Sequence, residues 1–191
     1  MFNEARLRQL SRLMQERGWD FLLLYGHSWR KDFFRCLVNL NFSGPHAAAL
    51  VSRSGGVSVI VSDPWDCETA SAAGNLSVSF EPDFGQGLRR AVGREQVEAG
   101  AIAGMEFLET RFVDAIRQAI GFDPVSATAE VEEIRRVKAP EEMEHLKRAA
   151  ELADRGYQHF ADVIEVGMAE YELVAEVESF LKSNGAEDNF M

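Results

Sequence analysis

Catalytic residue types are present in this chain, but none has the spacing of a known catalytic motif. There is no Ser in a G-x-S-x-G turn, no G-x-x-x-x-G-K-[ST] phosphate loop and no H-E-x-x-H zinc helix. His145 and His159 are fourteen residues apart, so they are not the i, i+4 pair that binds zinc on a helix. Gly85-Gln86-Gly87 lacks the third glycine of a dinucleotide fingerprint. No catalytic and no metal-ligating residue is therefore predicted in the chain.

The segment from His27 to Phe34 is a candidate for ligand binding. It follows the apolar run from Phe21 to Tyr25, and it contains Trp29, Arg30 and Asp32. Ligands of open α/β sheets bind near the carboxyl ends of strands, where an exposed Trp beside an Arg could contact a substrate or a partner. The alternative is a loop that covers an edge of the hydrophobic core.

The carboxylates of the last third of the chain do not form an acid/base pair. Glu142, Glu144, Glu170 and Glu172 lie on helical segments at spacings typical of solvated faces. Glu170 is expected in the first turn of its helix, where the helix dipole favours a negative charge.

Composition indicates a globular protein without a membrane span. The chain has 191 residues, 46% of them hydrophobic and 27% charged, and no apolar run approaches the ~20 residues that span a bilayer. Cys36 and Cys67 have no C-x-x-C spacing, which favours buried free thiols and a cytoplasmic location. The net charge of −11 is concentrated in residues 131–191, with a net of −8, so nucleic acid is not an expected partner.

The first two thirds of the chain read as a mixed α/β domain. Leu7, Leu10 and Met14 predict a helix capped by Asn3, and Trp19–Tyr25 predicts a buried strand. Two short apolar runs around a Gly-Gly turn predict a hairpin. The remaining expected elements are a helix from Asp63-Pro64 to about Gly74, a strand at 76–80, a helix at 88–92, a strand at 101–104, a helix capped by Thr110 and a last strand at 124–126.

The last sixty residues predict two long amphipathic helices. Pro140 stands at the first helical position, and apolar residues recur at helical spacing up to Gly167, where a turn leads to the second helix. The expected cap positions, Ala139 and Ala169, carry no side-chain oxygen, and each costs about 1 kcal/mol relative to Ser or Thr. No further segment follows to cover the apolar faces, and we expect an incomplete helical domain.

Four blocks of this terminal segment resemble the start of the catalytic domain in the creatinase / Xaa-Pro peptidase family, which includes prolidase and aminopeptidase P. The spacing of all four agrees with the family, and the blocks are residues 134–142, 149–154, 167–173 and 185–186.

Three positions depart from the family pattern. Ala139 and Ala169 replace Ser or Thr, and Val166 replaces Pro. The first 125 residues resemble the creatinase N-terminal domain, a mixed α/β domain of ribonuclease-H-like topology, more weakly. The resemblance implies residues 1–128 as that domain and 129–191 as the first helices of an incomplete pita-bread catalytic domain.

The resemblance further implies a dimeric metallohydrolase. In the family, two Asp, one His and two Glu hold two divalent ions, here expected to be Mn, Co or Zn, which activate a bridging water for attack on a peptide or small amide. All five ligands lie downstream of the Gly185-Ala186 block, and the chain ends five residues after it. In family dimers the N-terminal domain can reach the partner's active site, which makes Phe42 and His46 candidate substrate contacts.

Three functions remain open at this point. The chain is expected to be a non-catalytic N-terminal part of a metal-dependent peptidase or creatinase-like hydrolase, with roles in homodimer contacts and substrate access. The second hypothesis is a stand-alone binding or interaction module whose acidic helices dock a partner, which requires Met143, Leu146, Phe180 and Phe190 to be buried within the chain. The third is an unrelated small enzyme that uses Trp29, Arg30 and Asp32.

Overall fold

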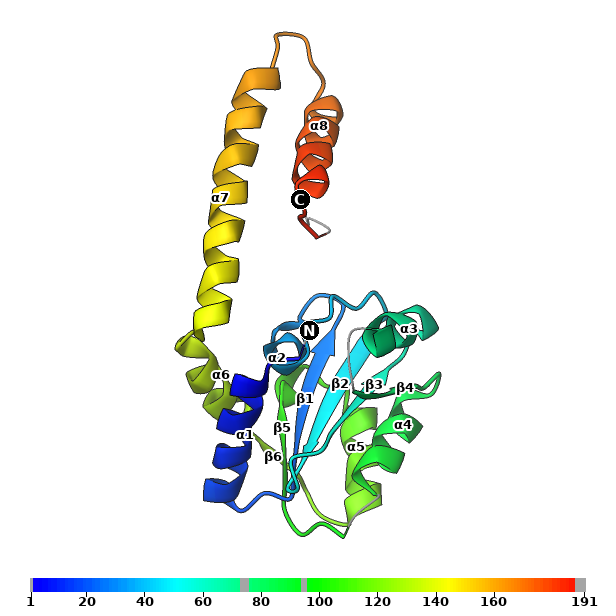
Figure 1. The fold of residues 1–191 in the computed structure, drawn as a ribbon. Coiled ribbons are helices and arrows are strands. Elements are labelled where there is room, and N and C mark those ends of the chain that lie inside the picture. Colours follow the sequence, from blue (N-terminus) through cyan, green and yellow to red (C-terminus); the bar gives the residue numbers. More distant parts are fainter. Residues whose placement is uncertain (1, 73–75, 94–95, 188–191) are drawn as a thin grey trace. The chain divides into compact units, whose positions relative to one another are not determined.

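The computed structural model describes residues 2–72, 76–93 and 96–187. The chain divides into two compact units, Met1–Val137 and Lys138–Met191. The elements of the first unit are, in chain order, α1 (Glu4–Arg17), β1 (Phe21–His27), α2 (Asp32–Leu37), β2 (His46–Ser52), β3 (Val57–Val61), α3 (Pro64–Ala72), β4 (Ser77–Phe80), α4 (Phe84–Val92), β5 (Gly100–Ala103), the 3₁₀ helix η1 (Met105–Phe107), α5 (Thr110–Ile120), β6 (Val125–Ser126) and α6 (Thr128–Arg136) (Figure 1).

The described strands form one six-stranded mixed sheet in the order β4-β3-β2-β1-β5-β6. β2 is antiparallel to both of its neighbours, β1 and β3, whereas β1, β5 and β6 are mutually parallel and β4 is parallel to β3. The predicted mixed α/β class, with an antiparallel hairpin inside the sheet, is confirmed.

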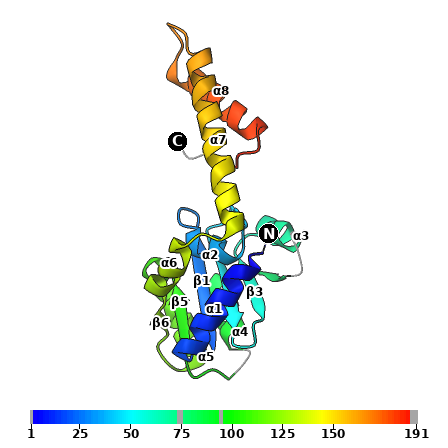
Figure 2. The same cartoon turned by 60° about the vertical axis from the view of Figure 1, so that its left-hand side comes forward.

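Alternation along the central strand β1 separates two hydrophobic cores. Leu22 and Leu24 point into a core that includes residues of α1, α2 and α6, whereas Phe21, Leu23 and Tyr25 point into a core shared with α4 and α5. Successive side chains of a strand face opposite sides of the sheet, so a strand buried on both faces is apolar throughout. The two views place α1 and α6 on one face and α4 and α5 on the other (Figures 1 and 2).

A buried arginine joins the first helix of this unit to its last one. Arg6 of α1 is 1% exposed, and its guanidinium donates to the carbonyls of Ile134 and Val137 at 2.6 and 2.8 Å. These carbonyls lie at the end of α6, where no next turn of helix supplies N–H donors. The predicted domain boundary at 128/129 precedes the division at 137/138 by this one helix, which Arg6 ties to α1.

Elements defined by local signals match their predictions closely. The hairpin pairs Val51 with Val57, and Asn3 accepts the N–H of Arg6 as the cap of α1. Asp63 accepts the N–H of Trp65 at 2.9 Å as α3 begins at Pro64. The predicted end of that helix, Gly74, lies outside the described residues.

Two predictions for the first unit were wrong in detail. α4 begins at Phe84 rather than at residue 88, because Asp83 caps it by accepting the N–H of Gln86 at 3.1 Å. Thr110 is the first residue of α5 and not its cap, since Glu109 occupies the cap position and makes no side-chain cap bond. The short helix α2 lies in a segment for which no helix was predicted.

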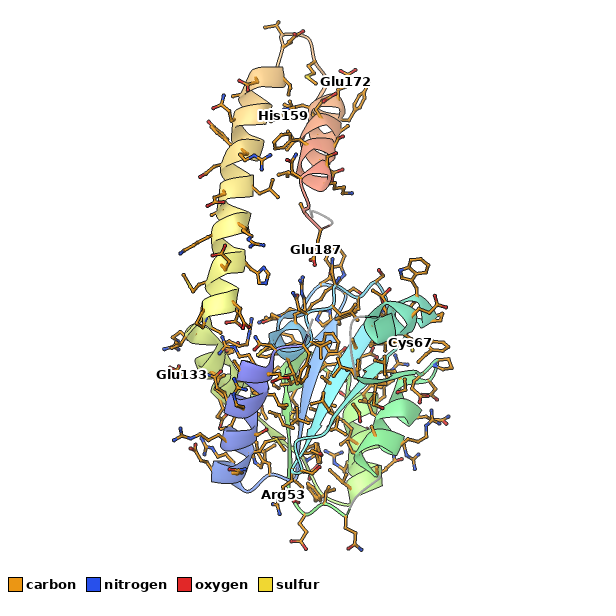
Figure 3. All side chains as sticks on the ribbon, in the orientation of Figure 1. Arg53, Cys67, Glu133, His159, Glu172 and Glu187 are labelled. Atoms are coloured by element: carbon orange, nitrogen blue, oxygen red, sulfur yellow. The ribbon has the colours of Figure 1, made fainter. Side chains whose placement is uncertain are left out.

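The second unit consists of the helices α7 (Pro140–Val163) and α8 (Glu170–Ser183) in the part that the structure describes. They pack through small and aromatic side chains: Gly156 is buried, and the ring of His159 stacks on Phe180 at 4.4 Å (Figure 3). The carboxylates of Glu142 and Glu172 each accept the N–H of the residue at the cap position, at 2.8 Å. Half of a capping box therefore forms at each helix although the caps are alanines.

Apolar side chains remain exposed on the second unit. Met143 and Leu146 are 43% and 49% exposed, and Tyr157 and Tyr171 are about three quarters exposed, at 75% and 74%. The stand-alone module hypothesis required Met143 and Leu146 to be buried within the chain, and this requirement is not met. Phe190, which the same hypothesis placed in a core, lies outside the described residues. None of the helices in the described ranges is long and apolar enough to cross a membrane.

Candidate functional site

Polar and aromatic side chains gather at the carboxyl end of β1, which is the edge of the sheet where the sequence predicted ligand contacts. His27 ends β1 and pairs in register with His46, the first residue of the antiparallel strand β2. Because β2 runs in the opposite direction, the end of one strand and the start of the other meet at the same edge. α4 and α5 begin beside them, since rings of both helices contact His46.

A chain of polar contacts runs from Tyr25 through His46 to Glu109. The Tyr25 hydroxyl lies 2.9 Å from His46 Nδ1, and Nε2 of the same ring lies 3.4 Å from Glu109 Oε1. Burial, together with the Glu109 carboxylate, raises the pKa of Tyr25 to about 12. The Glu109 carboxylate can only accept, which favours the tautomer of the neutral ring with its proton on Nε2. In that tautomer Nδ1 accepts the hydrogen bond of the Tyr25 hydroxyl.

Aromatic rings enclose His46 and decide its charge. The ring of Phe84 stacks on the imidazole at 5.2 Å, and the ring of Phe112 meets it edge-on at 5.0 Å. This burial lowers the pKa of His46 below its ordinary value of 6.5, although Glu109 opposes the shift. A neutral imidazole held between a hydroxyl and a carboxylate can relay or accept a proton, and it can also serve as a structural bridge.

The two predicted substrate contacts lie on opposite faces of the sheet. Phe42 is fully buried in the core on the α1 side, where its ring meets Phe34 edge-on at 5.3 Å, and Lys31 donates to its carbonyl at 2.6 Å. His46 packs instead among rings of the α4 and α5 side. The structure thus does not bring the two side chains together, and a ligand contact by the Phe42 ring would require the segment at 41–44 to open. A substrate contact by either residue stays a prediction.

Asp66 holds the backbone that leads into His46. Its side chain is 2% exposed, and its two oxygens accept the N–H groups of Ser43 and Gly44 at 2.7 and 2.8 Å. A side chain at Gly44 would come within 2.7 Å of Asp63 Cβ, so the backbone approaches α3 closely at this point. Sequence reasoning missed Asp66. The available signal was an acidic residue in the first turn after Asp63-Pro64, which also fits an ordinary helix start.

The predicted ligand loop forms a tight turn from His27 to Arg30. The two end residues exchange backbone hydrogen bonds, each of 2.9 Å, which leaves Ser28 and Trp29 at the tip. Trp29 is 81% exposed. Asp32, the third member of the predicted group, binds Arg135 of α6 at 2.8 Å.

Arg30 lies on an aromatic ring that sequence reasoning did not connect to it. Its guanidinium carbon is 4.1 Å from the centroid of the Phe107 ring, and its Nε is 3.6 Å from Asp32 Oδ1. Phe107 belongs to the 3₁₀ helix η1, far along the chain, and nothing in the local sequence marks it as a partner.

The described residues do not fit the two-metal centre that the family resemblance implies. In the part of the chain that the structure covers, no group of three or more His, Cys, Asp or Glu side chains is placed to hold a metal ion. Both cysteines are free, but only Cys36 is buried. Cys67 is half-buried, so the prediction of two buried thiols was correct for one of them.

Comparisons with known proteins agree with the resemblance seen in the sequence. The chain is similar to the X-Pro aminopeptidase of Thermotoga maritima MSB8, with a TM-score of 0.80 and 24% identity over 95% of this chain and 50% of that one. It is also similar to an Xaa-Pro dipeptidase of Bacillus anthracis, with a TM-score of 0.68 and 24% identity over 96% of this chain and 50% of that one. The creatinase/prolidase N-terminal domain of an X-Pro dipeptidase from Streptococcus pyogenes matches with a TM-score of 0.59 and 10% identity, over 69% of this chain and 99% of that domain.

A sequence relative supports the same family over a shorter stretch. The uncharacterized peptidase YqhT of Bacillus subtilis (strain 168) is 31% identical over 65 residues, which are 34% of this chain and 18% of that protein. No family model matches the chain. The predicted resemblance to creatinase and Xaa-Pro peptidases is confirmed, and what is shared is the fold. The chain spans about half the length of the solved full-length relatives named here.

Proposed function

We propose that the chain is the N-terminal part of a metal-dependent Xaa-Pro peptidase or creatinase-like hydrolase, non-catalytic by itself, which serves dimerisation and substrate access. One observation carries this proposal: the fold of an X-Pro aminopeptidase matches 95% of the chain with a TM-score of 0.80. The separately solved N-terminal domain from Streptococcus pyogenes covers 69% of the chain. The match to the X-Pro aminopeptidase covers 95% and therefore extends beyond the N-terminal domain.

In this proposal the chain contributes two pieces to the whole enzyme. Residues 1–128 form the creatinase-type N-terminal domain, and residues 129–191 supply the first helices of the metallopeptidase-like domain. Two divalent ions, Mn, Co or Zn, are held by residues outside these 191, and the substrate is a small peptide or a small amide. The free thiols of Cys36 and Cys67 are compatible with work in the cytoplasm.

Substrate access is the role that we assign to the edge of the sheet at His46. In a homodimer this edge faces the partner's catalytic domain, where His46, and Phe42 if its segment opens, contact the substrate. The support is the clustering of Tyr25, His46 and Glu109 at the carboxyl end of the central strand, the position where α/β sheets bind ligands.

A peptidase assay tests the non-catalytic assignment. The 191-residue chain is incubated with an Ala-Pro dipeptide and with a longer X-Pro peptide, each with added Mn²⁺, Co²⁺ or Zn²⁺, and the released amino acids are measured. We expect no turnover above a boiled sample. Turnover that EDTA abolishes and Mn²⁺ restores would show that the chain assembles a metal site of its own, which would overturn the assignment.

The oligomeric state tests the dimer. Light scattering after size exclusion is expected to give twice the chain mass of 21.3 kDa at micromolar concentration. A monomer at every concentration up to about 100 μM would remove dimerisation from the proposal, since the standard protein interface supports affinities tighter than that.

A further inference from the structure

The turn at the end of β1 carries Arg30. Its guanidinium is held in one orientation but makes no side-chain hydrogen bond in the described part of the chain. The two reciprocal hydrogen bonds between His27 and Arg30 fix the backbone of the turn, and the Ser28 hydroxyl ties its tip to the carbonyl of Gly44 at 3.4 Å. The Arg30 guanidinium lies on the ring of Phe107 at 4.1 Å, a distance at which cation–π attraction holds it in place. Its orientation is therefore set before any ligand binds.

The terminal nitrogens of Arg30 have no acceptor in the described chain. The one ion pair of this side chain is Nε with Asp32 Oδ1 at 3.6 Å, which is too long for a good hydrogen bond. The side chain is 43% exposed, so solvent reaches part of it. A guanidinium in this state offers two parallel N–H donors, the arrangement that binds a carboxylate in a bidentate manner.

Arg30 does not have a carboxylate to itself. Asp32 is shared with a second guanidinium, because its Oδ2 binds Arg135 at 2.8 Å. Two cations thus share one carboxylate. The nearest acidic neighbour of Phe107 in sequence, Glu106, is ionised, but it accepts the hydroxyls of Ser126 and Thr128 and makes no contact with Arg30. The positive charge of Arg30 is therefore only partly compensated by its neighbours, which favours binding of an anion.

An apolar surface lies beside the free donors. Trp29 precedes Arg30 at the tip of the turn and is 81% exposed, and the Phe107 ring beneath the guanidinium is 37% exposed. Exposing a large aromatic side chain to water is unfavourable, and Trp beside Arg is the combination enriched where proteins bind ligands and partners. A ligand that joins a carboxylate to an apolar group would satisfy both features at once.

We propose that Trp29, Arg30 and Phe107 form a binding site for small carboxylates that carry an apolar group next to the acid, chemically the C-terminal end of a short peptide with an apolar last residue. Arg30 forms the bidentate pair, Phe107 holds it flat, and Trp29 covers the apolar group. The turn follows β1 at the same end of the sheet as His46, but the proposal does not need peptidase activity, because binding is measurable in the 191-residue chain without turnover.

The proposal is tested by comparing the binding of N-acetyl-leucine with that of N-acetyl-leucinamide, which has a similar shape but no negative charge. The 191-residue chain is titrated with N-acetyl-leucine, with N-acetyl-leucinamide and with acetate, and binding is followed by ¹⁵N chemical shifts of Arg30 and of the three tryptophan indoles. We expect saturable binding of the acid with a Kd near 1 mM or below, and at least about tenfold weaker binding of the amide and of acetate. Equal affinity for acid and amide, or no saturation by the acid at 20 mM, would overturn the proposal.

Three substitutions separate the contribution of the planar guanidinium of Arg30 from that of its charge and from that of the Trp29 ring. Arg30→Gln is expected to weaken N-acetyl-leucine binding by about tenfold or more, and Arg30→Lys nearly as much, because lysine keeps the charge and loses the planar guanidinium. Trp29→Ala is expected to abolish the preference for N-acetyl-leucine over acetate. The matched control is Arg155→Gln, an arginine that also lies over a ring, that of Phe180, but donates to Asn184.

The control variant must bind as the unaltered chain does, and a loss equal to that of Arg30→Gln would contradict the assignment to Arg30. Inorganic phosphate supplies a further arm. If it binds as tightly as the acid and Trp29→Ala leaves it unchanged, the site is a general oxyanion site and the assigned ligand class is wrong. Should Arg30→Gln fail to fold by circular dichroism, Arg30→Lys and Phe107→Leu carry the test, and wild-type affinity in both would overturn it.

Discussion

The guanidinium of Arg6 is buried, and its hydrogen bonds fix the end of α6. We expect Arg6→Met to lower the free energy of unfolding by about 1.5–3 kcal/mol, because the carbonyls of Ile134 and Val137 lose their hydrogen bonds to a charged donor. Urea unfolding followed by tryptophan fluorescence measures this unit alone, since all three tryptophans lie before residue 66. Arg8→Met is the control: Arg8 is exposed and lies 3.9 Å from Glu4, so it should change stability by less than about 0.5 kcal/mol. Equal losses would show that burial of Arg6 contributes nothing.

Protonation of His46 links stability to pH. Its pKa is lowered in the fold by burial, so the unfolded chain binds the proton more tightly. The stabilising contribution is therefore complete above the ordinary value of 6.5 and is lost as pH falls through the folded value. We expect the unaltered chain to lose more stability than His46→Gln between pH 7.5 and 5.5, by urea unfolding at each pH. Parallel curves for the two proteins would contradict the assignment.

Asp20 and Tyr25 titrate outside the range from pH 5.5 to 7.5, so they do not contribute to the difference measured there. Backbone N–H groups of Glu98 and Ala99 donate to Asp20 and hold its pKa below the ordinary 3.8, so its contribution is lost only in stronger acid. Tyr25 has the opposite sign: with a pKa raised to about 12, its contribution is present below pH 10 and is lost as pH rises through 12.

At the scale of elements, the half-formed capping box of α7 can be completed. Ala139→Ser adds a hydroxyl that can accept the N–H of Glu142, whose carboxylate already binds the N–H of residue 139. We expect the helix start to gain about 0.5–1 kcal/mol, with slower hydrogen exchange of the amides at 141–143. The same change at Ala161, inside the exposed face of α7, should instead weaken the helix by about 0.5 kcal/mol. Faster exchange in Ala139→Ser would contradict the prediction.

Elements were predictable from sequence where the signal was local. The hairpin around Gly55-Gly56 and the start of α3 at Asp63-Pro64 depend on residues that are adjacent in the chain, and both were confirmed. α4 was predicted only from residue 88. The cap at Asp83 and the packing of the helix against β3 outweigh the low helix propensity of Gly85 and Gly87, so the helix begins earlier.

The candidate site was predictable only in part, because its members are far apart in sequence. His46 and Phe42 were named because the family resemblance places their segment at contacts with the partner's active site. The partners of His46, Tyr25 and Glu109, lie 21 and 63 residues away along the chain, and nothing local joins them. Burial of the Phe42 ring against Phe34 accounts for the aromatic side chain without any ligand.

At the scale of the whole molecule, the two units differ in how many of their described residues are buried. Both hydrophobic cores lie within residues 2–134, whereas Gly156 is the one buried residue among those described from 138 to 187. We expect α7 and α8 to unfold at a lower urea concentration than the first unit, so the midpoint from helical circular dichroism should precede the midpoint from tryptophan fluorescence. Phe180→Ala should widen the gap by lowering the first midpoint alone. Coincident transitions for the unaltered chain would show that the two units unfold as one.

The hydrogen bonds from Arg6 to the end of α6 also have a consequence for the order in which contacts can form during synthesis. The partner carbonyl of Arg6, at Ile134, is 128 residues further along the chain. A ribosome adds about 5–20 residues per second, so the first helix leaves the exit tunnel roughly 6–26 seconds before the helix end that it binds. The central strand β1 likewise waits for β5. The Arg6 guanidinium must therefore remain without these acceptors until residues 134–137 have been made, although α1 can already pack on β1 and α2. A pause in translation before residue 137 would lengthen that interval.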